Sequence, residues 1–137
     1  MATPITELVT QAENGNLSLK ADPAAFVALE KAMTERIQRL MLVQQKIRVV
    51  AHQEAWGLGE SSEVLTSAQT LVRRFREKAE HGPNNAVTAL QSHIDAADEM
   101  RTLFRAIRQR IEESDAAFAA KFKELATAQG VDVGGNR

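Results

Sequence analysis

The sequence has no cysteine and no tyrosine, few aromatic residues, and no long run of apolar residues. The absence of cysteine excludes disulfide bonds, thiolate catalysis, cysteine-ligated zinc sites and iron–sulfur clusters. The formal net charge is -1 over 137 residues, so the chain lacks the basic surplus with which proteins bind nucleic acids or anionic membranes. No apolar stretch approaches the roughly 18 residues of a membrane span, and no secretory signal peptide is visible. We therefore expect a protein that starts in the cytoplasm, inserts into no membrane and leaves the cell only by a route that carries folded proteins.

What is present favours a single all-α domain. Hydrophobic residues make up 44% of the chain and charged residues 26%, which is typical of a globular protein. The three prolines stand where helices could begin, and none of the seven glycines interrupts an apolar repeat. No alternating pattern of the kind that predicts a strand occurs.

Residues 22–127 predict an antiparallel helical hairpin. Asp22 is a suitable N-cap and Pro23 a suitable first-turn residue, and apolar residues then recur every three or four positions as far as Val50. Charged residues such as Glu30 and Arg48 are expected on the opposite, solvent-facing side. Residues 1–21 predict a short N-terminal helix with a connector, and residues 128–137 a flexible tail.

The second arm of the hairpin is expected over residues 60–127. Trp56-Gly57-Leu58-Gly59 ends the first repeat, and its two glycines permit a tight reversal. The apolar repeat of the second arm runs on to Leu125, with a break near Gly82-Pro83 where a glycine cap is followed by proline.

No group of residues predicts an enzyme. His52, His81 and His93 lie in different segments, without the spacing of a metal site, so no metal, cofactor or small-molecule substrate is expected. The acidic residues near positions 95–99 and 112–115 stand three or four residues from arginines and are interpreted as helix-surface ion pairs. The basic run of residues 73–78 is the one candidate for nucleic-acid contact, but it is short and offset by neighbouring glutamates.

The apolar repeats instead predict association with a protein. Two arms of this length cannot cover two wide apolar stripes with each other alone, and uncovered apolar surface indicates an interaction site. A second helical hairpin, identical or related, would complete a four-helix bundle. Trp56 has two interpretations, packing under the turn or anchoring a partner. The predicted interaction stripe consists of Ile37, Leu40, Ile47, Phe104, Ile107 and Phe118.

Three stretches resemble a known family. They are the opening Asp22-Pro23-Ala24-Ala25-Phe26, the turn Trp56-Gly57-Leu58-Gly59-Glu60, and the helical run of residues 71–79. Together they resemble the Trp-x-Gly helical hairpin (ESAT-6-like) proteins of actinobacterial type VII (ESX) secretion, and more narrowly the larger secretion-associated subgroup. The likeness covers residues 22 to about 125. Leu58 stands where the family motif has glycine.

The resemblance implies a function and a signal. The family's export signal is Tyr-x-x-x-Asp/Glu, and its nearest match here runs from Ile111 to Asp115, with isoleucine in place of tyrosine. The leading hypothesis is a non-enzymatic hairpin associated with type VII secretion, either exported itself or carried by a partner. The alternative is an intracellular structural or adaptor bundle with no secretion role, and a nucleic-acid-associated helical protein comes third.

Overall fold

The computed structural model describes residue 14 and residues 22–132, and these residues form helices and no strand. The helices are α2 (Pro23–Ala51), α3 (Thr66–Ala79), α4 (Ala86–Ser114) and α5 (Ala116–Ala128). The all-α prediction is confirmed. The helix predicted within residues 1–21 and the last five residues of the predicted tail lie outside the described residues.

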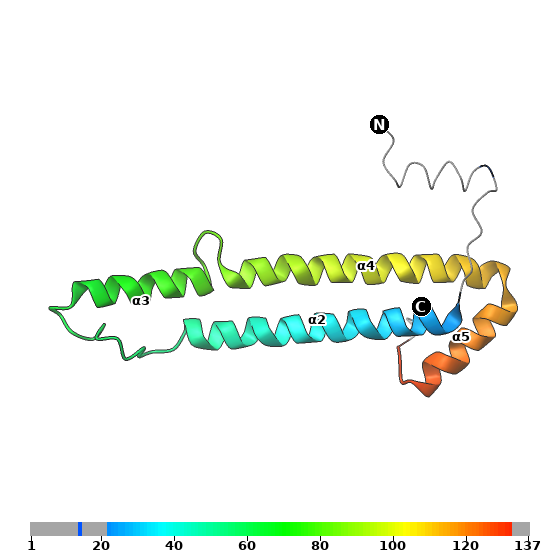
Figure 1. The fold of residues 1–137 in the computed structure, drawn as a ribbon, viewed down its shortest axis with the longest axis horizontal. Helices are drawn as coiled ribbons and strands as arrows, with labels where there is room; N and C mark the ends of the chain where they lie inside the picture. The colour runs from blue at the N-terminus through cyan, green and yellow to red at the C-terminus, as the bar shows by residue number, and fades with distance from the viewer. Residues whose placement is uncertain (1–13, 15–21, 133–137) are drawn as a thin grey trace.

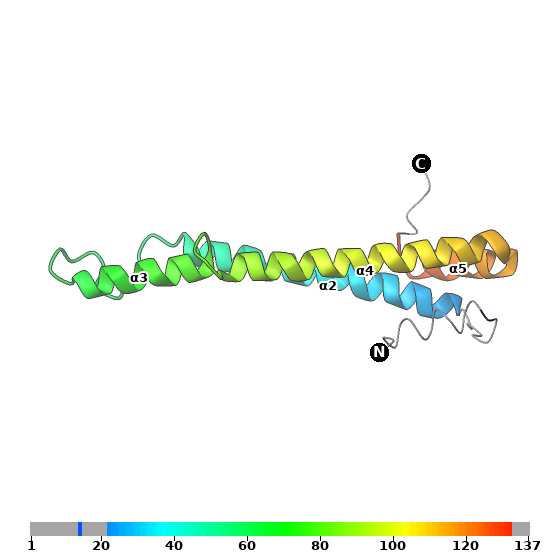
Figure 2. The same cartoon turned by 90° about the horizontal axis from the view of Figure 1, so that it is seen from above.

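The helices form a long, thin hairpin (Figures 1 and 2). α3 and α4 follow one another along nearly the same line and make up the second arm, and α2 runs antiparallel beside them as the first arm (Figure 1). As predicted, α2 begins with an N-cap, because the Asp22 carboxylate accepts a hydrogen bond from the Ala24 N–H at 3.0 Å and Pro23 follows.

The predicted break near Gly82-Pro83 interrupts the second arm without reversing it. After α3 ends at Ala79, His81 takes a left-handed conformation with φ 69°, and the Gly82 N–H donates to the Glu77 carbonyl at 3.0 Å. The chain loops outward and α4 resumes in a similar direction (Figure 1). The Asn85 side chain caps α4 by accepting from the Thr88 N–H at 2.8 Å.

A second break at Asp115 corrects the prediction of one apolar repeat continuing to Leu125. α4 ends at Ser114, and the Asp115 carboxylate caps α5 by accepting from the Phe118 N–H at 2.9 Å. The chain reverses there, and α5 folds back beside the start of α2 (Figure 1). A continuous helix would leave Phe118 and Phe122 in solvent, whereas the reversal buries both rings.

This reversal builds the apolar core of the molecule. Val27 of α2 and Phe122 and Ala126 of α5 are at most 2% exposed. The rings of Phe26 and Phe118 meet edge to face with centroids 5.8 Å apart, a favourable arrangement for two aromatic rings. A cluster of the apolar core therefore lies at the α5 end of the hairpin, and further apolar residues such as Val72, Ile94 and Ala97 are buried along its length.

The seam between α2 and α4 contains buried polar side chains, and α4 also buries the apolar residues Val87, Ile94 and Ala97. The expectation that Glu30 faces solvent is wrong, whereas Arg48 is exposed as expected. Glu30 is only 6% exposed and is paired with Arg105. Gln44 is equally buried, and its amide nitrogen donates to the Val87 carbonyl at 3.0 Å. Side-chain hydrogen bonds thus connect the two arms in addition to the buried apolar residues, and part of the apolar repeat is left outside.

Candidate functional site

An apolar surface runs along one side of the two arms. On α2, its residues stand one or four positions before the seam residues Gln44 and Ala51. On α4, they stand one or four positions before Arg101 and Arg108. Antiparallel helices are related by a two-fold axis perpendicular to both, so equivalent positions lie on the same side of the pair. We call this surface the apolar flank: Leu40, Val43, Ile47 and Val50 of α2, with Met100, Phe104 and Ile107 of α4.

Four of the seven residues of the apolar flank are exposed, and Leu40, Ile47 and Phe104 are half-buried. Val43 and Met100 are 44% and 47% exposed, and Val50 and Ile107 are exposed to a similar degree. The positions one residue after the seam, on the other side of the pair, carry polar side chains: Gln38, Gln45, Thr102 and Gln109. These positions are more polar than the apolar flank, although Met41, Leu42, Val49 and Leu103 are exposed apolar residues outside it.

The predicted interaction stripe coincides with this flank only in part. Leu40, Ile47, Phe104 and Ile107 belong to it. Ile37 stands seven residues before Gln44 and therefore in the seam itself. Phe118 is 5% exposed inside the α5 core, because the chain reverses at Asp115, and its assignment to the stripe is wrong.

The Trp56 segment is packed on α3 and is not a tight reversal. Residues 52–65 run alongside α3, and the chain turns back only where that helix begins (Figure 1). The Trp56 ring stacks on Phe75 with centroids 5.8 Å apart and an interplanar angle of 21°. The Arg76 guanidinium donates to the carbonyls of Gln53 and Glu54 at 2.8 and 3.1 Å. These contacts give Arg76, within the basic run, a role in holding the loop.

Glu60 organises the turn motif around Trp56. Its carboxylate accepts hydrogen bonds from the backbone N–H groups of Trp56, of Gly57 at 3.2 Å and of Leu58 at 2.9 Å. Gly57 and Gly59 both take positive φ, at 74° and 93°, which allows the backbone to curl around the carboxylate. Hydrogen bonds from its own N–H and then from Trp56 lower the pKa of Glu60, against partial burial, which raises it.

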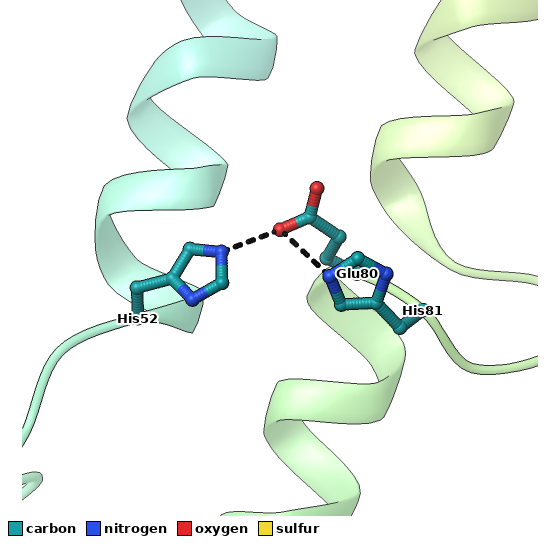
Figure 3. A group of neighbouring side chains, drawn as sticks. All are labelled: His52, Glu80 and His81. Carbon is teal, nitrogen blue, oxygen red and sulfur yellow. Dashed lines mark hydrogen bonds and ion pairs between the residues drawn. The ribbon is translucent and has the colours of Figure 1, made fainter.

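His52, Glu80 and His81 meet where α2 ends and α3 gives way to α4. His52 Nε2 lies 2.9 Å and His81 Nε2 lies 3.6 Å from Glu80 Oε2 (Figure 3). Arg48 Nε donates to the other carboxylate oxygen, Oε1, at 3.1 Å. Desolvation raises the pKa of Glu80, but the hydrogen bond from Arg48, the charge of His81 and the bond from His52 outweigh it and lower that pKa.

Sequence reasoning missed this group because its members are far apart in the chain. His52 and Glu80 are separated by 28 positions, and only the antiparallel packing brings them together. Glu80 and His81 are adjacent in sequence, but no spacing rule links them to His52. The third histidine, His93, is exposed on α4 and belongs to no such group among the described residues.

The Ile111–Asp115 segment lies at the second break. Ile111 is half-buried and packs against the α5 core, while Asp115 caps α5. The residues proposed as a degenerate secretion signal thus have structural contacts of their own.

No helix among the described residues is long and apolar enough to cross a membrane. Comparison of the chain with protein-family models, with curated proteins and with solved structures found no match.

Proposed function

We propose that the protein is a helical-hairpin interaction module that acts by association and not by catalysis. Its apolar flank docks on the matching flank of a second helical hairpin, in the simplest case a second copy of this chain, to form a four-helix bundle. The observation that carries the proposal is the alignment of two apolar rows, with exposed members on both arms, on one side of the hairpin. Rows of Val, Leu, Ile, Met and Phe at helical spacing are what such a bundle buries.

The test compares matched pairs of substitutions. Val43→Glu with Met100→Glu places two charges on the apolar flank, and Gln45→Glu with Thr102→Glu places two on the other side of the pair. Light scattering after size exclusion should give twice the chain mass for the wild type and the control pair, and the single-chain mass for the flank pair. Circular dichroism checks that all three proteins remain helical. A wild-type chain that stays monomeric and fails to pair with a homologous hairpin would contradict the proposal.

We further propose that this association serves type VII secretion, with the hairpin either exported or carried by its partner. Support comes from the order helix, Trp-Gly segment, helix, with Trp56 in the segment that joins the two arms. Ile111 and Asp115 stand where the family has its export signal.

Export is measured in the native host with and without the secretion motor ATPase, against a cytosolic lysis control. Motor-dependent appearance in the medium supports this role. Retention in both strains favours the alternative, an intracellular adaptor that uses the same apolar flank.

A further inference from the structure

We propose that His52, Glu80 and His81 bind one divalent transition-metal ion, best matched by zinc, and thereby link the two arms of the hairpin. The ligand atoms are His52 Nε2, His81 Nε2 and Glu80 Oε2. The proposal is independent of the docking of the apolar flank.

The distances fit such a site. One ligand atom from each of the three residues lies within 4.8 Å of the others, and the two imidazoles approach the same carboxylate oxygen (Figure 3). A tetrahedral zinc ion with bonds of about 2.0–2.1 Å separates its ligand atoms by roughly 3.4 Å. The separations of the two Nε2 atoms from Glu80 Oε2, 2.9 and 3.6 Å, bracket that value. Both imidazoles are largely exposed, so each can rotate into place without disturbing packing.

The ligand types select the class of metal. Two imidazoles with one carboxylate suit zinc, copper or nickel, whereas magnesium and calcium prefer sets made of oxygen ligands alone. Three protein ligands leave a fourth position of a tetrahedral zinc open. His52, Glu80 and His81 also line an open groove of about 700 Å³ between residues 52–60 and α3, from which a water or a partner's side chain could fill that position.

Arg48 prepares the carboxylate for this role. It donates to Glu80 Oε1 and so leaves Oε2 directed at the histidines. The Glu80 side chain is 12% exposed, and a polar partner that fixes a ligating carboxylate typically changes metal affinity ten- to a hundredfold. Arg48 is therefore a positioning residue, one step away from the metal.

The backbone conformation directs the adjacent side chains of Glu80 and His81 toward His52. His81 has φ 69°, a conformation that non-glycine residues seldom adopt, although histidine and asparagine tolerate it better than most. This conformation, held by the Gly82 N–H bond to the Glu77 carbonyl, lets Glu80 and His81 both face His52 (Figure 3). An unfavourable backbone conformation that brings ligand atoms together is frequent at binding sites.

The experiment is a calorimetric titration of the untagged full chain with zinc chloride, because a histidine tag would itself bind zinc. We expect one ion per chain, and no binding of magnesium chloride under the same conditions. His52→Asn and His81→Asn should each weaken zinc binding at least tenfold. Asparagine at position 81 keeps the left-handed backbone accessible, so loss of binding does not reflect loss of the turn.

His93→Asn is the matched control and should bind zinc like the wild type. Zinc should also raise the midpoint of thermal unfolding of the wild type and of this control, and a chelator should reverse the rise. The proposal is overturned if the wild type takes up no zinc. It is also overturned if the chain carrying both His52→Asn and His81→Asn binds zinc as tightly as the wild type.

Discussion

Arg105 of α4 holds Glu30 of α2 across the hairpin, 75 positions away in the sequence. Its Nε donates to the two carboxylate oxygens at 2.9 and 3.0 Å, and its Nη2 donates to Oε1 as well. The hydrogen bond to Glu30 raises the pKa of Arg105, against desolvation, so the guanidinium stays charged at every accessible pH. This pair, in which Glu30 is buried and Arg105 partly exposed, joins α2 and α4 beside the α5 core.

Removal of the guanidinium should destabilise the protein strongly. Arg105→Ala leaves the Glu30 carboxylate, 7% exposed, without its charged partner, and should cost about 3 kcal/mol of unfolding free energy in urea denaturation. The control is Arg110→Ala, which breaks a pair with Glu113 that is open to solvent and should cost less than about 0.5 kcal/mol. Equal costs for the two variants would show that the seam does not depend on the Glu30 pair.

The stacked pair Trp56 and Phe75 should behave as one coupled unit. A double-mutant cycle with Trp56→Ala and Phe75→Ala should give a coupling of about 1 kcal/mol, since stacked rings contribute beyond their buried area. Phe75→Ala should also shift the fluorescence of Trp56, the only tryptophan, to longer wavelength by opening its ring to water. Val64→Ala, at a side chain 85% exposed, is the control and should leave both readouts unchanged. Additive costs of the two ring deletions would argue against the stack.

Local signals in the sequence were enough to predict the fold class, the start of α2 and the break in the second arm. Asp22-Pro23 begins α2 and Gly82-Pro83 lies in the break of the second arm, because capping and proline effects act over a few residues. Asp115 was missed because Phe118 and Phe122 continue the spacing of the preceding helix across the reversal. Only the burial of those rings against α2 reveals that the chain turns back.

The seam and the metal-ligand group could not be predicted for a related reason. Each arm has two rows of side chains, one mixed polar and apolar and one wholly apolar, and either row could have faced the partner arm. The choice depends on pairs such as Glu30 with Arg105 and Gln44 with Val87, which are far apart in the chain. The meeting of His52 with Glu80 follows from the same register and is equally invisible in spacing.

Glu60 should make the free energy of unfolding depend on pH in the acidic range. Its pKa is lowered in the folded state from 4.5, so its carboxylate stabilises the fold fully above that pH. The contribution is lost as the pH falls through the lower, folded value. Glu60→Gln should therefore lose less stability than the wild type between about pH 6 and about pH 3, measured by urea midpoints. Glu63→Gln, in the same loop, is the control and should keep the wild-type pH dependence of stability. If Glu60→Gln also kept that pH dependence, the role of the three N–H donors would be contradicted.

Gly82 should tolerate a side chain less well than Gly57. A Cβ at position 82 would lie 2.4 Å from the Glu77 carbonyl oxygen, so Gly82→Ala must displace backbone and should cost about 2–3 kcal/mol. Gly57 has positive φ but nothing within 4 Å of a Cβ, so Gly57→Ala should cost only about 1 kcal/mol. Thermal or urea unfolding of the two variants decides the order, and the reverse order would mean that the loop around Trp56 is the less adaptable of the two.

Asp115 can be tested for capping and for secretion separately. Asp115→Ala removes the acceptor for the Phe118 N–H and should destabilise the protein by about 1 kcal/mol, so loss of export in that variant alone would be uninformative. Asp115→Ser keeps an N-cap oxygen but removes the negative charge, and should unfold at nearly the wild-type urea midpoint. If the carboxylate is part of an export signal, Asp115→Ser is folded but retained in the cell. If its role is the cap alone, Asp115→Ser is indistinguishable from the wild type in both assays, and the resemblance of residues 111–115 to a secretion signal has no functional content.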